Sequence, residues 1–194
     1  MHVHAKEQTV QRNACTVIGN LVHDHKQNAI LVASAPHNGH ELILHAMRRF
    51  SSYSFLQASA CRALAGLTAV DSIGKLALQA PLLVHEAIIA AMRTFQDDDQ
   101  VQHTGFLALR NCIKNGAYSV ENVSKRPSNY VADRELRKQF VSAPLLVHEL
   151  ILRAMRHYPD FSELQLAGCN ALWVLALSDG IFYFLFSVLC LVKK

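Results

Sequence analysis

The sequence predicts an all-α chain in which helical repeats stack into a right-handed α-solenoid, and three features of the sequence lead to this fold class. The heptad APLLVHE occurs at residues 80–86 and again at 143–149, too long a match for chance in a chain of 194 residues. Alanine–proline pairs recur in steps of 45 and 63 residues, at 35–36, 80–81 and 143–144. A valine or leucine followed by glutamine recurs in nearly the same register, at 10–11, 56–57, 101–102 and 164–165. Repeats of 40–47 residues are typical of stacked helical arrays, and one insertion accounts for the longer step.

The first helix that stands out in each copy begins near a histidine–glutamate pair. We expect these helices at residues 39–50, 83–95 and 146–158. Apolar residues lie at 43, 46, 47 and 50, and at the equivalent positions of the other two copies. This i, i+3, i+4, i+7 spacing predicts one buried stripe along each helix.

A longer helix follows each of these helices and opens with the glutamine pair. We expect the long helices at residues 8–23, 55–69, 100–115 and 162–177, with an apolar stripe that begins at Val10 in the first copy. The second residue of the stripe, four positions after the first, is always small: Ala14, Ala60, Gly105 and Gly168. Glycine costs about 1 kcal/mol inside a helix, so another helix is expected to pack closely there. Shorter helices are expected before the alanine–proline pairs, at 26–34, 72–79 and 134–142, with proline marking each turn.

These segments resemble the armadillo family. VQHTGFLALRNCIKN at 101–115 and LQLAGCNALWVLALSDG at 164–180 are similar to the third helix of an armadillo repeat, and AMRHYPDFSELQ at 154–165 is similar to the second helix and its turn. A narrower similarity links the chain to the N-terminal armadillo segment of leucine-rich-repeat kinases. The resemblance covers roughly residues 8–178 and implies units of one short, one medium and one long helix.

The expected organisation is a repeat array over residues 1–178 and an atypical apolar tail over 179–194. The array divides into a partial repeat and three full repeats, at 8–24, 26–70, 71–115 and 116–178. The last repeat opens with an insertion at 116–133, whose mixture of Gly, Ser, Asn, Pro and charge is typical of a surface loop. Neither end has an obvious polar cap, so the chain resembles a segment of a longer array.

The tail contains the run IFYFLFSVLCLVKK at 181–194. As a helix its first twelve residues would span about 18 Å, short of the bilayer core of about 30 Å. A buried edge, a weak membrane-surface anchor and an aberrant terminus remain as three interpretations of this run.

The composition favours a packed protein of a reducing compartment. Hydrophobic residues make up 51% of the chain and charged residues 18%, which argues against disorder. A net charge of +4 without a basic cluster gives no reason to expect nucleic-acid binding. Five cysteines without close pairing and a polar start without an apolar signal run suggest the cytoplasm, with the nucleus as the alternative.

No motif of the sequence predicts catalysis, a metal site or a cofactor. His40 and His45 are five residues apart, so they do not match the H-E-x-x-H spacing of zinc proteases. Cys15, Cys61 and Cys169 share one register with Phe106, which favours a buried apolar role. We therefore expect a chain that is not an enzyme.

A recurring arginine near the end of each medium helix allows two interpretations. Arg48, Arg93 and Arg156 occupy one register position. Each would interact favourably with the C-terminal dipole of its helix. Alternatively, the three side chains form a basic stripe for an acidic partner.

The armadillo resemblance implies a non-catalytic scaffold that binds a protein or peptide along the long helices. The positions that match the family's asparagine ladder are Asn20, Gly66, Asn111 and Val174, so two of four keep the asparagine. Thr16, Arg62, Leu107 and Asn170 replace the tryptophan of nuclear-import adaptors, which argues against a nuclear-localisation peptide. The expected contact residues are Asn20, Arg62, Arg110, Asn111 and Asn170, with the insertion as the rival surface. The alternative function is a regulatory armadillo segment of a larger multidomain enzyme, such as a leucine-rich-repeat kinase.

Overall fold

The structure is a computed structural model that describes residues 1, 3–79, 82–116, 140 and 146–176. Within these residues the chain is all-α and contains no strand. The helices are α1 (Gln8–Val22), α2 (Lys26–Ala33), α3 (Gly39–Arg49), α4 (Ser54–Thr68), α5 (Asp71–Leu78), α6 (Val84–Thr94), α7 (Asp99–Gly116), α9 (Val147–His157) and α10 (Ser162–Ala176).

The helices predicted from the sequence are confirmed wherever the structure describes them, and no end differs by more than one residue. The short helix expected at 134–142 lies outside the described residues except for Phe140, and so does the tail 179–194. The expected insertion begins one residue early, because Gly116 still belongs to α7; its remainder, 117–133, also lies outside the described part.

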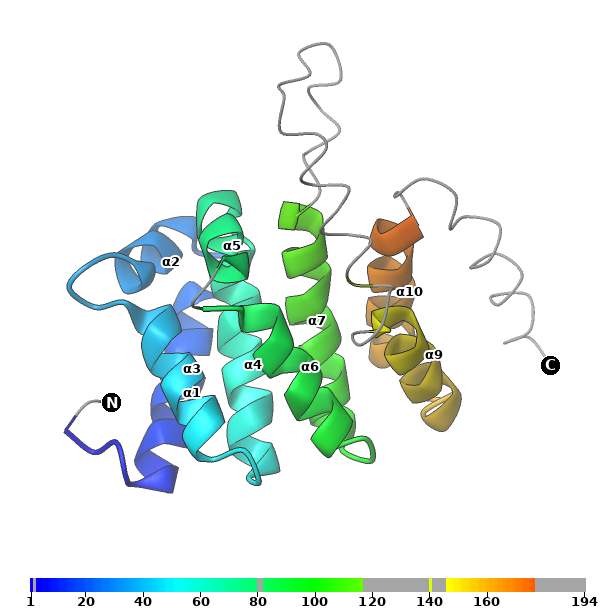
Figure 1. Cartoon of the computed structure of the whole chain (residues 1–194), viewed down its shortest axis with the longest axis horizontal. Helices are drawn as coiled ribbons and strands as arrows, with labels where there is room; N and C mark the ends of the chain where they lie inside the picture. Colours follow the sequence, from blue (N-terminus) through cyan, green and yellow to red (C-terminus); the bar gives the residue numbers. More distant parts are fainter. Residues whose placement is uncertain (2, 80–81, 117–139, 141–145, 177–194) are drawn as a thin grey trace, which may run out of the picture.

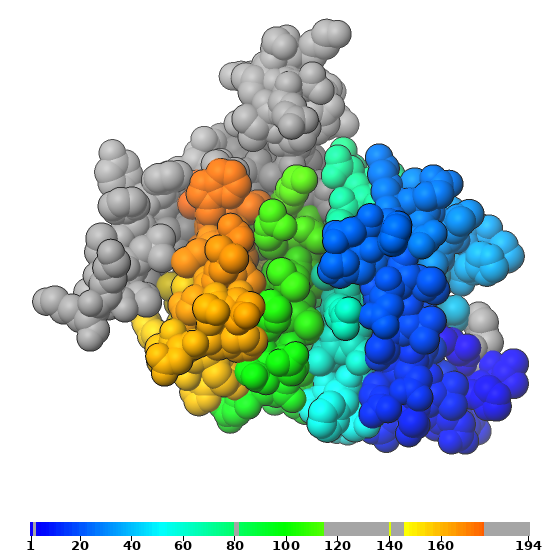
Figure 2. Space-filling model, turned by 180° about the vertical axis from the view of Figure 1, so that it is seen from behind, coloured from blue at the N-terminus to red at the C-terminus, as the bar shows by residue number. Residues whose placement is uncertain are grey.

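The four long helices α1, α4, α7 and α10 lie side by side, with α4 between α1 and α7, and α7 between α4 and α10 (Figures 1 and 2). The medium helices α3, α6 and α9 lie on one side of this row, each against the long helix that follows it in the chain. The short helices α2 and α5 lie near one end (Figure 1). The core is therefore the layer between the long and the medium helices.

The predicted stripes form this core, because side chains that recur on one helix face can be withdrawn from water together. On α4 the side chains of Leu56, Leu64 and Leu67 are completely buried. On the medium helices the isoleucine and methionine of each stripe are at most 2% exposed: Ile43, Met47, Ile88, Met92, Ile151 and Met155. Burying one such side chain contributes about 1.5–3 kcal/mol, so the layer supplies most of the stabilisation.

The stripe prediction is wrong for α1. Val10, Val17 and Leu21 are exposed by 39%, 56% and 49%. On α4 the equivalent residues are covered by α3, and on α7 by α6, but among the described residues no medium helix lies against α1 in this way.

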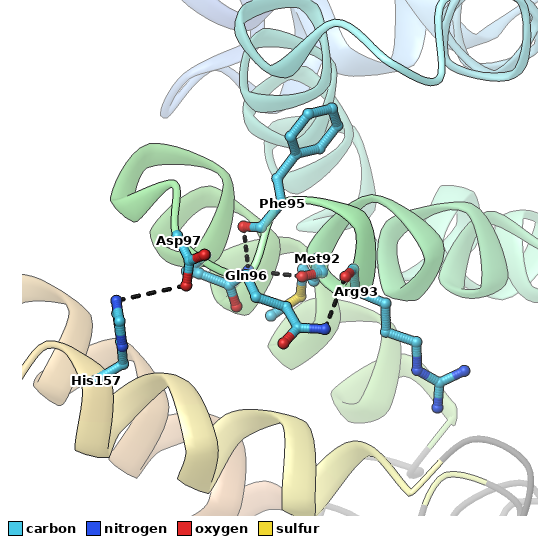
Figure 3. Close-up of polar contacts among 7 residues, drawn as sticks. Met92, Arg93, Phe95, Gln96, Asp97 and His157 are labelled. Carbon is cyan, nitrogen blue, oxygen red and sulfur yellow. Dashed lines mark hydrogen bonds and ion pairs between the residues drawn. The ribbon is translucent and has the colours of Figure 1, made fainter.

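The recurring glutamine has a structural role that is the same in all four copies. The Gln57 Nε2 donates to the carbonyl oxygens of Met47 and Phe50, each at 2.9 Å. Gln102 makes the same pair of bonds to Met92 and Phe95 at 2.8 Å, and the two carbonyl oxygens converge at the end of α6 (Figure 3). The remaining copies repeat the pattern with distances of 2.7–2.9 Å: Gln165 to Met155 and Tyr158, and Gln11 to Met1 and His4.

We call these four side chains the clamp glutamines. The last carbonyl groups of a helix have no partner within the helix. Gln57, Gln102 and Gln165 each supply two donors to this end from the next helix, 10 and 7 residues further along the chain, whereas Gln11 makes the same two bonds to the turn before α1. The side chain thereby fixes the angle between a medium helix and the long helix after it. Met1 and His4 occupy the register of Met47 and Phe50.

The small residue of the long-helix stripe makes room for a methionine. A Cβ added at Gly105 would lie 2.6 Å from the Cγ and Sδ atoms of Met92, and one at Gly168 would lie 2.7 Å from the Met155 Sδ. Atoms do not approach this closely without displacement. The predicted close approach is confirmed, and its cause is the side chain that α6 or α9 inserts.

A left-handed residue precedes each medium helix. Asn38, Leu83 and Leu146 are the N-caps of α3, α6 and α9, with φ of 43°, 46° and 43°. Asparagine tolerates this conformation, whereas leucine adopts it rarely. The turn therefore has the same backbone in three copies although its residue differs.

Candidate functional site

The exposed face of the long helices is the candidate site. Figure 2 shows α1, α4, α7 and α10 next to one another on this face. One register position is at least partly exposed on each helix and carries Thr16, Arg62, Leu107 and Asn170. The next turn carries Gly19 and Ala65, which are buried, and Arg110 and Trp173, which are half-buried and exposed. None of these positions belongs to the stripe that packs against the medium helices. The exposed and half-buried members of the two rows are therefore the surface on which the copies present different chemistry.

Polar side chains connect α1 and α4 across this face. The Arg62 Nη2 donates to the Asn20 Oδ1 at 2.9 Å, and both residues are exposed. One turn away, the Thr16 hydroxyl donates to the Ser59 Oγ at 3.2 Å. Two of the predicted contact residues, Asn20 and Arg62, are therefore brought together. Exposed bonds of this kind exchange with water at little cost, so a ligand can replace them.

Asn111 is positioned differently from what the ladder comparison implied. Its Nδ2 donates to the carbonyl oxygen of Ala65 on α4 at 2.8 Å. The other two ladder positions also face a neighbour: Val174 is 5% exposed, and a Cβ on Gly66 would lie against the Val22 side chain. The ladder register thus contributes to helix packing, and the amide nitrogen of Asn111 is already bonded.

The part of the face on α7 and α10 combines a cation with exposed apolar side chains. Trp173 and Leu166 are 60% and 65% exposed and lie seven residues apart on α10, which places them on one side of the helix. Arg110, half-buried, holds the register of Trp173 on α7. Asn170 lies between Leu166 and Trp173 and is also half-buried. An exposed tryptophan beside an arginine is the composition typical of binding hot spots.

His103 belongs to the same part of the face. Its ring packs edge-on against Phe161 with the ring centroids 5.5 Å apart. Burial lowers the pKa of His103 from its ordinary value, although Glu163 and Asp99 oppose this shift. Burial therefore favours the neutral imidazole, which offers hydrogen bonds rather than charge.

The sequence reasoning missed Leu166 and Trp173. A signal for Trp173 was present, because the other copies place Gly19, Ala65 and Arg110 in that register. A tryptophan in a position that is otherwise small or charged does not belong to the stripe. For Leu166 the signal was weak, since a leucine within an apolar helix is most simply a core residue.

The histidines and cysteines considered as metal-binding or catalytic residues do not form a site. His40 is 3% exposed, whereas His45 is exposed on another side of α3. Burial raises the pKa of the Cys15, Cys61 and Cys112 thiols to about 12, which makes them poor nucleophiles. Across the described ranges no three His, Cys, Asp or Glu side chains are grouped so that they could hold a metal ion.

The buried role expected for Cys169 is wrong. Cys15 and Cys61 are completely buried, as is Phe106 in the same register, but Cys169 is exposed. This register faces the next long helix in the row. Within the described part of the chain no long helix follows α10, so the thiol meets solvent.

The recurring arginines lie on the opposite side of the molecule from this face. Arg48, Arg93 and Arg156 are all exposed. The Arg48 Nη2 donates to the carbonyl oxygen of Leu82 at 3.0 Å and so joins α3 to the turn before α6. This bond gives Arg48 a structural role that neither the dipole nor the basic-stripe interpretation had predicted.

Comparison with known proteins gives no match to a family model, a curated protein or a solved structure. Among the described residues no helix is both long and apolar enough to cross a membrane. The case for function therefore comes from the helix faces themselves.

Proposed function

We propose that the chain is an armadillo-type α-solenoid that acts as a non-catalytic scaffold and binds a protein or peptide along the exposed face of α1, α4, α7 and α10. The observation that carries this proposal is the exposure of Leu166 and Trp173 on α10, with Arg110 in the register of Trp173 on the neighbouring helix α7. Leaving a tryptophan and a leucine in water forgoes burial that contributes about 1.5–3 kcal/mol for each side chain. A partner that covers them recovers this free energy.

The arrangement of the four copies supports the same interpretation. The clamp glutamines and stripes fix the helix angles, so the outer rows form a rigid surface before any partner arrives. A preorganised surface pays less ordering entropy on binding. The face offers arginines at its centre, at Arg62 and Arg110, which suits a partner with carboxylates near apolar residues.

Peptides selected by phage display against the whole chain provide the test. We expect the double substitution Arg110→Ala and Trp173→Ala to weaken the selected peptides at least tenfold, because truncating a hot-spot residue typically costs 2 kcal/mol or more. Arg153→Ala, exposed on α9, is the matched control and should leave affinity unchanged. Asn111→Ala is less suitable because it also breaks the bond to α4.

Deletion of 117–133 tests the rival surface. These residues lie outside the described part, and a long loop on a rigid array often carries recognition. If the deletion abolishes peptide binding while the Arg110→Ala and Trp173→Ala variant still binds, the binding site does not lie on the long helices.

A further inference from the structure

The turn between α3 and α4 carries two exposed serines directly after two exposed arginines. Residues 48–52 have the sequence Arg-Arg-Phe-Ser-Ser, so Ser51 follows an arginine at two and at three positions. Arg48, Arg49, Ser51 and Ser52 are all exposed, and both serines lie outside the helices. Among the described residues neither serine hydroxyl has a hydrogen-bond partner. Figure 1 shows this turn at the lower edge of the molecule, where another protein can reach it.

The spacing of the two arginines is the kind that basophilic protein kinases recognise. Such kinases select substrates by charge, with carboxylates that pair with cations at fixed positions before the reacting serine. An arginine–carboxylate pair is charge-assisted and often bidentate, so two arginines in succession give a specific signal. The equivalent stretches of the other two copies, 93–97 and 156–160, each contain one arginine and no serine. The pattern therefore belongs to this turn and is not a consequence of the repeat.

The last turn of α3 must open before a kinase can bind this stretch as an extended chain, and few contacts oppose the opening. The Arg48 Nη2 donates to the carbonyl oxygen of Leu82 at 3.0 Å in an exposed bond. The Arg49 guanidinium lies 6.0 Å from the centre of the Phe50 ring. The Gln57 Nε2 donates to the Phe50 carbonyl oxygen at 2.9 Å. A helix end held in this way opens at a much lower free energy than the whole fold.

The surroundings of Ser51 favour a phosphate once it is attached. A phosphoserine carries a charge of about −1.5 to −2 at pH 7 and pairs readily with arginine, and Arg48 and Arg49 are three and two residues away. The turn also leads into the N-terminus of α4, where the helix dipole favours negative charge. α7 and α10 have Asp99 and Glu163 in their first turns, whereas the first turn of α4 has no acidic residue. A phosphate on Ser51 would bring negative charge to this end of α4.

We propose that Ser51 is a phosphorylation site for a basophilic serine kinase, with ATP as the phosphoryl donor. The Ser51 Oγ attacks the γ-phosphorus and forms the new P–O bond, while the bond from the γ-phosphorus to the β,γ-bridging oxygen breaks. The hydroxyl proton passes to the catalytic base of the kinase, and ADP leaves with the electron pair of the broken bond. The phosphate then stabilises the start of α4. The proposal does not depend on the function proposed above, because the turn is not part of the two rows on the long-helix face.

The probe is the catalytic subunit of the cyclic-AMP-dependent protein kinase, with Mg²⁺ and ATP, acting on the whole folded chain. We expect a phosphate on Ser51, located by tandem mass spectrometry and absent from Ser51→Ala. Residues 125–128, Lys-Arg-Pro-Ser, hold the other serine with this spacing and lie outside the described part, so the kinetic variants also carry Ser128→Ala. Arg49→Ala should lower kcat/KM at least tenfold, because a charge-assisted contact with the kinase is lost. Arg156→Ala, an exposed arginine of α9, is the matched control and should leave kcat/KM unchanged.

A synthetic peptide of residues 45–57 gives the rate of the same sequence without the fold. The whole chain should react within about a hundredfold of the peptide, because only the last turn of α3 has to open. The phosphorylated chain should melt about 1–4 °C higher than the unmodified chain. Absence of phosphate on Ser51, or a rate more than about a thousandfold below that of the peptide, as expected if only globally unfolded molecules react, would overturn the site. A lower melting temperature would overturn the stabilising role of the phosphate.

Discussion

Replacing a clamp glutamine by methionine removes two hydrogen bonds while keeping the shape of the side chain. At Gln57, which is 2% exposed, both bonds measure 2.9 Å. A buried acceptor left without its donor costs about 1–3 kcal/mol. The Phe50 end is partly open to water, which reduces its share. We therefore expect Gln57→Met to lower the free energy of unfolding by about 2–3 kcal/mol.

We expect Gln102→Met to lower stability less than Gln57→Met. The Gln102 Nε2 makes the same two bonds, at 2.8 Å, but its Oε1 is buried without a partner, which is not the case for Gln57. Substitution by methionine removes that unsatisfied oxygen and returns roughly 1 kcal/mol. The expected loss at Gln102→Met is therefore about 1–2 kcal/mol, smaller than at Gln57→Met although the bonds are shorter.

Urea denaturation followed by circular dichroism at 222 nm measures both changes. Gln100→Met is the matched control, since Gln100 is exposed on the same helix and should change stability by no more than about 0.5 kcal/mol. Equal stability of the control and both clamp variants would refute a stabilising role of the clamp. A larger loss at Gln102 than at Gln57 would refute the cost assigned to the unpaired oxygen.

Two further predictions concern packing and pH. Gly105→Leu should destabilise the fold by about 1–3 kcal/mol, because the larger side chain overpacks against Met92. Adding Met92→Ala to this variant should restore part of the lost stability. Strictly additive effects of the two substitutions in a double-mutant cycle would contradict the contact. Burial lowers the pKa of His40 and His85 below 6.5, with Glu41 and Glu86 opposing the shift, so the unfolded chain takes up protons first as the pH falls. The stability that the two neutral histidines contribute is then fully present above pH 6.5 and decreases toward pH 5. Replacing both histidines by leucine should make the urea midpoint depend less on pH. A pH dependence of the urea midpoint that stays unchanged in this variant would contradict the prediction.

The helices could be predicted from the sequence because their signals are local. The alanine–proline pairs, the apolar stripes and the Val/Leu–Gln pairs repeat along the sequence. Each of them marks an end or a face of one helix, and none depends on where the neighbouring helices lie. The role of Gln57 could not be predicted in this way. Its partners, the carbonyls of Met47 and Phe50, are backbone groups whose position depends on the angle between two helices.

The position of a residue within its repeat did not predict whether its side chain is exposed. Val17 and Cys169 hold positions that are buried in other copies, and only the presence of a neighbouring helix decides whether they are covered. The register also did not predict how the candidate contact residues are bonded. Asn20 and Arg62 do meet on the long-helix face, whereas the amide of Asn111 turns to Ala65 because α4 lies within reach.

The differences between the copies indicate where specificity resides. Positions at which the copies agree, the clamp glutamine and the medium-helix methionine, are occupied by contacts within the chain. Positions at which they disagree include the row with Gly19, Ala65, Arg110 and Trp173, which is buried at its first two members, half-buried at Arg110 and exposed at Trp173. Packing restricts the first set to one solution that every copy repeats. Packing also restricts Gly19 and Ala65 of this second set, whereas the Trp173 side chain is left 60% exposed. The variation that packing does not explain therefore lies on α7 and α10, and these two helices are where the proposed partner would make its strongest contacts.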